Sequence, residues 1–350
     1  MNLRRKTKEI QCGNVMVGGN HQVSVQSMIT SDPRNISSAV AEILRLEEAG
    51  CDIVRIAVPT MESAKNIYDI KKQTTIPIVA DIHFDYRLAL ESIKQGIDGL
   101  RLNPGNIGDE ERVRKVVNQA KKNRIPIRIG VNGGSLEKQL LEKYGHATPE
   151  ALVESAMGHV RILEDMDFDD IVISLKASDV QLTVAAYQLI SKKVHYPLHL
   201  GITEAGTVKT GTIKSAIGIG SLLLMGIGDT IRVSLTGDPV EEVYVGKQIL
   251  KSLGLKQGEV TIISCPTCGR CNINLIKLAD EVERKIGQLK KPIKVAIMGC
   301  AVNGPGEAKD ADIGIAGGID SALLFKKGKV IKKVPENEIL ATLLYEIEKM

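Results

Sequence analysis

Short apolar segments alternate with longer amphipathic segments along most of the chain. The apolar segments are rich in β-branched residues, and their ends carry polar or charged residues. Near-continuous apolar strands of this kind are typical of parallel sheets that are covered on both faces. The pattern predicts eight strands, at 23–28, 53–58, 76–82, 99–103, 125–132, 170–176, 197–203 and 230–235.

Amphipathic helices are predicted between these strands, among them 39–48, 110–122 and 151–164, and a helix at 240–253 completes the series. In the first of them, Val40, Ile43, Leu44 and Leu46 have the spacing of a helix that is buried on one side. Strand–helix alternation repeated eight times favours an α/β fold of the (β/α)8 TIM-barrel type. An open doubly wound sheet is the alternative, because counting strands does not show that the sheet closes.

The pattern changes after the predicted barrel, which spans residues 1–253. Residues 254–259 read as a short linker, and 260–350 form a small α+β domain. Its predicted elements are strands at 260–264, 294–298 and 313–316, a helix near 273–288 and a last helix from 336. A short hairpin around 15–20 precedes the first barrel strand.

Composition narrows the class of protein. Of the 350 residues 43% are hydrophobic and 25% charged, which is ordinary for a soluble globular protein. The net charge of +4 is mild, and aromatic residues make up only 3% with no Trp, so nucleic acid is not an expected partner. No apolar run is long enough for a membrane span, and no apolar core follows the basic start, so a cytoplasmic location without a signal peptide is expected.

Cations are placed at the ends of otherwise apolar strands, where the chemistry of such barrels resides. Alternation along each strand groups them by face with polar neighbours. The candidate internal counter-ions, chiefly Asp81 and Glu204, are too few to neutralise them, so an anionic ligand with several charges, such as a phosphate compound, is the natural complement. Structural ion pairs remain the alternative for any single one. The candidate binding residues are Arg55, Arg101, Asn103, Arg128, Asn132, Lys176, Arg232 and Ser234.

Two further residues end predicted strands. His83, in Ala-Asp-Ile-His-Phe-Asp, either touches substrate or is a hydrogen-bonded structural histidine. Glu204, in Gly-Ile-Thr-Glu-Ala-Gly, is either a proton donor or the counter-ion of a nearby arginine. No nucleotide-binding fingerprint accompanies them, so no nucleotide cofactor is expected.

Four of the six cysteines lie in the small domain, in Cys265-Pro-Thr-Cys268-Gly-Arg-Cys271 and at Cys300. Thiolates at this spacing suit a metal centre, and a chain of this length needs no disulfide staples. Zinc is one reading, although zinc sites usually take their last ligands from a second close pair. An iron–sulfur cluster bound by these thiolates is the better fit.

These motifs, together with Gly-Cys300-Ala-Val-Asn303-Gly-Pro-Gly-Glu307, resemble the cluster domain of the 4-hydroxy-3-methylbut-2-enyl diphosphate synthase family, and the likeness extends over nearly the whole chain. The resemblance implies an iron–sulfur oxidoreductase of the non-mevalonate isoprenoid pathway. Its substrate would be 2-C-methyl-D-erythritol 2,4-cyclodiphosphate, which is reductively opened and dehydroxylated. It further implies a small domain similar to the ferredoxin–sulfite-reductase-like fold.

The resemblance also assigns roles. One 4Fe–4S cluster per chain would be held by Cys265, Cys268, Cys300 and Glu307, whereas spacing alone nominates Cys271 in place of the glutamate. Glu204 would donate a proton, and Asn303 would contact the substrate from the cluster side. Reduced ferredoxin or flavodoxin would supply electrons. The family forms homodimers in which one cluster domain closes over the partner's barrel, and the short linker leaves open which barrel is capped.

Two other functions remain open on the sequence. One is a phosphate-binding barrel enzyme, similar to the pterin-binding synthases, with a structural zinc tail. The other is a non-catalytic electron carrier, which would need neither a barrel mouth nor five cations. The colour and the metal content of the purified protein distinguish the zinc-tailed barrel from the iron–sulfur enzyme, whereas the five cations and the barrel mouth argue against the electron carrier.

Overall fold

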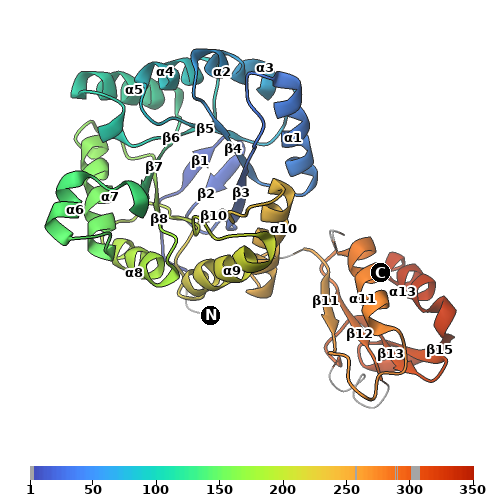
Figure 1. The fold of residues 1–350 in the computed structure, drawn as a ribbon. Helices are drawn as coiled ribbons and strands as arrows, with labels where there is room; N and C mark the ends of the chain where they lie inside the picture. The colour runs from blue at the N-terminus through green and yellow to red at the C-terminus, as the bar shows by residue number, and fades with distance from the viewer. Residues whose placement is uncertain (1–3, 257, 288, 290, 301–307) are drawn as a thin grey trace. The chain divides into compact units, whose positions relative to one another are not determined.

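The computed structural model describes residues 4–256, 258–287, 289, 291–300 and 308–350. The chain divides into two compact units, Met1–Leu255 and Lys256–Met350. Figure 1 shows the first as strands surrounded by helices and the second as a separate sheet with its own helices.

The first unit is a (β/α)8 barrel, as the alternation predicts. Its parallel strands pair in the order β8-β7-β6-β5-β4-β3-β10-β9. A parallel bridge between Ile173 of β8 and Leu198, next to β9, joins the two ends of that order and excludes the open doubly wound sheet. The strands are β3 (Ser24–Met28), β4 (Ile53–Ala57), β5 (Ile78–Asp81), β6 (Gly99–Arg101), β7 (Ile127–Asn132), β8 (Ile171–Lys176), β9 (His199–Leu200) and β10 (Thr230–Ile231).

The last two barrel strands are shorter than the sequence predicts. Residues 201–203 and 232–235 lie beyond the regular ladder and are joined to neighbouring chain by single backbone bonds, such as Arg232 N to Leu200 O at 2.9 Å. These residues therefore belong to the loops over the barrel mouth, although their sequence continues the apolar pattern.

Helices cover the outside of the strands (Figure 1). Thr148 caps one of them, because its hydroxyl accepts a hydrogen bond from Ala151 N at 3.1 Å and Pro149 occupies the first helical turn. In the first helix Val40, Ile43 and Leu46 are buried, but Leu44 is 45% exposed, so the prediction for Leu44 is wrong. The helices are α1 (Ile36–Glu48), α2 (Met61–Lys65), α3 (Ile67–Lys71), α4 (Tyr86–Lys94), α5 (Glu110–Asn123), α6 (Lys138–Tyr144), α7 (Pro149–Glu164), α8 (Val180–Ser191), α9 (Val208–Leu224) and α10 (Pro239–Ser252).

An antiparallel hairpin packs under the amino-terminal ends of the barrel strands. It consists of β1 (Ile10–Cys12) and β2 (Val15–Val17). Cys12 and Val17 form a buried cluster with Ile53 and Val79, the side chains of β4 and β5 that face them. The hairpin thus covers the end of the barrel opposite to the strand carboxyl ends.

The second unit is a five-stranded mixed sheet packed against helices. The order is β11-β12-β13-β14-β15, with the first three strands parallel and the last three antiparallel. The strands are β11 (Thr261–Ser264), β12 (Lys294–Met298), β13 (Ile313–Gly318), β14 (Ser321–Lys326) and β15 (Lys329–Pro335), and the helices are α11 (Leu275–Ile286) and α13 (Ile339–Glu348).

The sequence analysis did not predict β14 and β15. Most of β15 is exposed and carries lysines, so no apolar alternation marks it. The available signal was the Lys327-Gly328 pair between two β-rich segments. Both residues have positive φ, 47° and 73°, as the two-residue turn of a tight hairpin requires.

Candidate functional site

The interior of the barrel gathers five cations from five different strands or strand extensions. Four of them belong to the part toward the mouth, where the parallel strands end, whereas Arg128, the second residue of β7, lies deeper and lines a cavity on the side of the hairpin. Burial lowers the pKa of Lys176 well below its ordinary value, and the charges of Arg232, Arg55, Arg128 and Arg101 lower it further, in that order. These effects indicate that the five cations lie near one another. The five are Arg55 (β4), Arg101 (β6), Arg128 (β7), Lys176 (β8) and Arg232 (after β10).

Asp81, the last residue of β5, is the central counter-ion. Its carboxylate lies 3.2 Å from Arg101 Nη1, 3.8 Å from Arg55 Nε and 3.4 Å from His83 Nε2. Burial alone would raise the pKa of Asp81, but the hydrogen bond from His83 and the charges of Arg55 and Arg101 hold it well below its usual range. Asp81 is therefore a fixed negative charge that orients two arginines.

A second carboxylate, which the sequence analysis missed, holds Arg232. Glu242 lies on α10 and is 5% exposed, and its Oε2 is 3.5 Å from Arg232 Nε. The same carboxylate accepts hydrogen bonds from Ser27 Oγ at 2.9 Å and Leu235 N at 3.0 Å. The available signal was a glutamate beside Val243 on the apolar face of the helix.

Arg101 and Asn103 both hydrogen-bond to the backbone of one glycine, Gly130, on the neighbouring strand β7. Gly130 O accepts from Arg101 Nη2 at 2.8 Å and from Asn103 Nδ2 at 3.1 Å, and Gly130 N donates to Asn103 Oδ1 at 2.9 Å. A Cβ at Gly130 would lie 2.5 Å from Arg101 Nε, so only glycine lets the guanidinium cross β7. Asn103 thus clamps β6 to β7 in this structure.

Arg128 and Lys176 are buried and poorly compensated. Burial and then the charge of Arg101 lower the pKa of Arg128 to about 10. Its Nη1 donates to Gln26 Oε1, whereas Nε and Nη2 have no partner among the described residues. Lys176 passes over Gly201, where a Cβ would lie 3.2 Å from its Nζ. Buried cations without carboxylate partners are costly, which favours an anionic ligand here.

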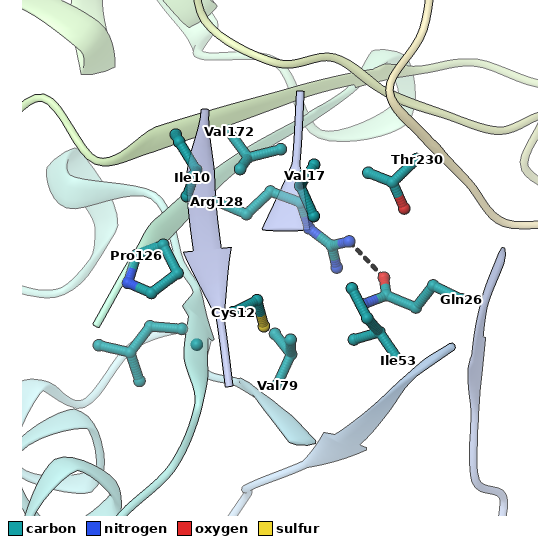
Figure 2. A pocket seen from close by; sticks show the side chains of 12 residues that line it. Ile10, Cys12, Val17, Gln26, Ile53, Val79, Pro126, Arg128, Val172 and Thr230 are labelled. Atoms are coloured by element: carbon teal, nitrogen blue, oxygen red, sulfur yellow. Dashed lines mark hydrogen bonds between the residues drawn. The ribbon is translucent and has the colours of Figure 1, made fainter. Parts of the chain in front are cut away.

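A small cavity lies below Arg128, on the side of the hairpin. Figure 2 shows the guanidinium bonded to Gln26 and surrounded by Cys12, Val17, Ile53 and other mainly apolar side chains. The cavity measures about 40 Å³, which is room for a few water molecules but not for a diphosphate. It is therefore not the substrate site.

The remaining predicted barrel residues have different surroundings. Asn132 Oδ1 accepts from Gly134 N at 3.1 Å, which caps the short turn η2 (Gly133–Ser135), and Ser234 is half-buried in the loop after β10. The side chain of His83 is 56% exposed beside Asp81. Glu204 is exposed with φ at 52°, and no ion pair found among the described residues includes it.

The cysteines lie at one end of the small domain's parallel strands. Cys265 follows β11, and its Sγ accepts a hydrogen bond from Gly299 N at 3.1 Å. Cys300 follows β12, which pairs with β11. Cys271 packs closely against Gly299, since a Cβ added to Gly299 would lie 2.7 Å from Cys271 Sγ. Cys268 is exposed, and no disulfide links any of the six cysteines.

The complete cluster-ligand set cannot be read from these residues. Asn303 and Glu307 lie outside the described part of the chain. Within the part that is described, no three His, Cys, Asp or Glu side chains stand together as ligands of one metal ion. The thiols of Cys265 and Cys271 nevertheless both lie against Gly299, and Cys300 is the next residue in the chain.

None of the described helices has the length and apolar character of a membrane span.

Known proteins resemble this chain along its whole length. The GcpE TIM-barrel domain matches residues 7–247, and the GcpE protein C-terminal domain matches residues 261–349. The 4-hydroxy-3-methylbut-2-en-1-yl diphosphate synthase (flavodoxin) of Caldanaerobacter subterraneus subsp. tengcongensis is 63% identical over 348 residues, 99% of this chain and 98% of that protein. The protein of the same name from Ruminiclostridium cellulolyticum is 60% identical over 347 residues, with shares of 99% and 98%.

Solved structures show the barrel again. The 3-dehydroquinate dehydratase of Geobacillus kaustophilus HTA426 superimposes with a TM-score of 0.50 at 15% identity, over 71% of this chain and 99% of that one. At this identity the likeness shows the fold alone.

Proposed function

The chain belongs to the GcpE family of 4-hydroxy-3-methylbut-2-en-1-yl diphosphate synthases, and we propose that its barrel mouth binds 2-C-methyl-D-erythritol 2,4-cyclodiphosphate for reductive ring opening. Two electrons and two protons convert this substrate into 4-hydroxy-3-methylbut-2-enyl diphosphate and water. The enzyme is an oxidoreductase of isoprenoid precursor synthesis by the non-mevalonate pathway.

The charge balance of the mouth is the observation that carries this proposal. Among the described residues, five cations face two buried carboxylates, Asp81 and Glu242, which leaves three positive charges without a counter-ion. A cyclic diphosphate brings several negative oxygens in one compact ligand. Guanidinium and ammonium groups are the side chains best suited to phosphate oxygens.

Asp81 and Glu242 form ion pairs with some of the five cations and not with the others. Asp81 orients Arg55 and Arg101, and Glu242 orients Arg232, so these guanidinium groups are positioned before the ligand arrives. Lys176 has no such partner, and a diphosphate next to it would raise its lowered pKa and keep it charged. Preorganised cations of this kind stabilise both the bound diphosphate and the charge that develops during ring opening.

Glu204 is the proposed proton donor. Its exposure and its left-handed backbone suit a side chain that turns toward a ligand better than one buried in an ion pair. His83 lies beside Asp81 at the same mouth and is proposed to contact the substrate, and Asn303 is proposed to do so from the cluster side. Asn132 and Ser234 complete the proposed binding set.

The cysteines fit an iron–sulfur cluster. The sulfur of Cys265 accepts a backbone N–H, the kind of hydrogen bond that stabilises cluster thiolates, and Cys300 follows the adjacent strand β12. We propose Cys265, Cys268, Cys300 and Glu307 as ligands. The 4Fe–4S group, when bound, supplies the two electrons one at a time. Among these ligands Glu307 would hold the group more weakly than the three thiolates would.

The electrons come from outside the chain. The relatives carry flavodoxin in their names, and flavodoxin is the proposed donor here, with ferredoxin as the alternative. We further propose a cytoplasmic homodimer in which the small domain of one subunit serves a barrel mouth. The resemblance to the family supports this arrangement.

Anaerobic purification tests the proposal. The protein should be brown, should contain iron and acid-labile sulfide, and should turn over the cyclic diphosphate with reduced flavodoxin. A colourless, zinc-loaded protein that binds the cyclic diphosphate but does not reduce it would instead support the phosphate-binding barrel with a zinc tail. An iron–sulfur protein that neither binds nor reduces the diphosphate would support the electron carrier.

A further inference from the structure

His159 joins two loops of the barrel mouth from behind. It lies on α7, and its residue is only 6% exposed. Neither ring nitrogen bonds to its own helix. One faces the loop after β6, and the other faces the segment after β7.

The first arm of the ring holds the loop after β6. Gly105 N donates to His159 Nδ1 at 3.3 Å, within the short turn η1 (Pro104–Asn106). A Cβ at Gly105 would lie 3.0 Å from His159 Cε1 and 3.3 Å from Nδ1. An alanine here would force the ring or the turn to shift slightly, so glycine suits this close approach.

The second arm reaches the segment after β7. His159 Nε2 lies 3.3 Å from Glu137 Oε1, and Ser155 Oγ, one turn earlier on α7, donates to the same oxygen at 2.9 Å. Since Nδ1 accepts from a backbone N–H, the proton of the neutral ring lies on Nε2 and points at the carboxylate. Burial lowers the pKa of His159 against the opposing effect of Glu137, which agrees with this neutral tautomer.

Both arms end close in sequence to the proposed substrate contacts. Gly105 is two residues after Asn103, which is clamped to Gly130, and Glu137 is five residues after Asn132. We infer that His159 is a positioning residue, whose ring fixes the spacing of the loops after β6 and β7 so that the mouth can receive the diphosphate. The inference rests on the proposed function and adds to it a residue that does not touch the substrate.

A buried histidine could also serve packing alone, so the test needs a matched control. His159→Phe keeps the volume and removes both arms, whereas His159→Asn places an amide oxygen where Nδ1 accepts from Gly105. Val160→Ala, at the next position of α7 and fully buried, weakens the core without touching either loop bond.

Steady-state kinetics with the cyclic diphosphate separate the two roles. His159→Phe should raise KM about fivefold per lost neutral hydrogen bond, with iron content unchanged and kcat affected less. His159→Asn should recover part of that loss, and Val160→Ala should lower the melting temperature with KM near the wild-type value. A His159→Phe KM equal to that of wild type, or of Val160→Ala, overturns the inference.

Hydrogen exchange gives a second readout that does not depend on turnover. Peptides covering 102–108 and 133–138 should exchange faster in His159→Phe than in Val160→Ala, and Gly105→Ala should accelerate the first peptide in the same way. If the wild-type enzyme fails to reduce the substrate, the proposed function fails while this exchange pattern still decides on the loops. Equal exchange in both α7 variants refutes the positioning role.

Discussion

Asp81→Asn is the sharpest single perturbation of the barrel mouth. The change keeps the size of the side chain but removes the charge that lies 3.2 Å from Arg101 and 3.8 Å from Arg55. Both arginines then remain half-buried without a carboxylate, and Arg55 lies near further cations, because Arg232 and Arg128 add to burial in lowering its pKa. The folded state therefore carries a cost that the unfolded chain does not.

The contacts set the size of this cost. Removing one partner of a buried ion pair destabilises a protein by about 3–5 kcal/mol. The lower end applies to Asp81, since the amide can still hydrogen-bond and both arginines are only half-buried. A loss of about 3 kcal/mol in a unit of this size corresponds to a melting temperature lower by about 6–12 °C.

Thermal unfolding with and without inorganic pyrophosphate measures the effect. The anion should stabilise Asp81→Asn more than wild type, because it compensates cations that the variant leaves unpaired. Asp32→Asn is the control, since Asp32 pairs with Arg34 at the exposed surface and should matter little. If Asp81→Asn melts like the control, or if pyrophosphate stabilises it no more than wild type, Asp81 is not the central counter-ion.

Three further predictions follow from the other charged and sulfur groups. The pKa of Lys176 is lowered in the free protein, so pyrophosphate binding should be accompanied by uptake of a proton at Lys176, and the affinity should fall as pH rises. Calorimetry in buffers of different ionisation enthalpy should show this proton uptake in wild type but not in Lys176→Met. Burial lowers the pKa of His199 far below 6.5, so below about pH 6.5 the unfolded chain binds a proton that the folded chain does not, and the free energy of unfolding should drop as pH falls. In chemical denaturation His199→Gln should show a weaker dependence of stability on pH, and a dependence equal to that of wild type would contradict the prediction. Cys271→Ser should keep iron and sulfide after anaerobic purification and Cys265→Ser should lose them, whereas the reverse result would favour the all-cysteine ligand set.

The barrel could be predicted because its signal is local. Eight buried parallel strands must each be apolar on both faces, and each must be followed by an amphipathic helix, so the whole pattern is written in short windows of sequence. Strand ends were harder, as in β9 and β10, because residues such as Ile202 and Val233 are buried in loops as well as in strands. In the small domain β15 was not predicted, because most of its residues are exposed and several are lysines, so it lacks the apolar alternation of a half-buried strand.

The cations of the site were also visible in the sequence, but their counter-ions were only partly so. An arginine inside an apolar strand is conspicuous, and alternation places it on one face. Glu242 belongs to a helix ten residues after Arg232, and its position beside Val243 on the apolar face of that helix is a weak sign that does not name its partner. The same holds for His159, whose two partners lie 54 and 22 residues earlier in the chain.

The residues that act as counter-ions of the arginines bear on which role Glu204 has. The sequence left it either as a proton donor or as the partner of an arginine. In the structure Asp81 and Glu242 take the arginines, and Glu204 stands exposed in a left-handed backbone conformation that costs a non-glycine residue of the order of 1 kcal/mol. We therefore keep the proposal that Glu204 donates the proton, because ring opening at a mouth so rich in arginine needs an acid that is not already committed to an ion pair.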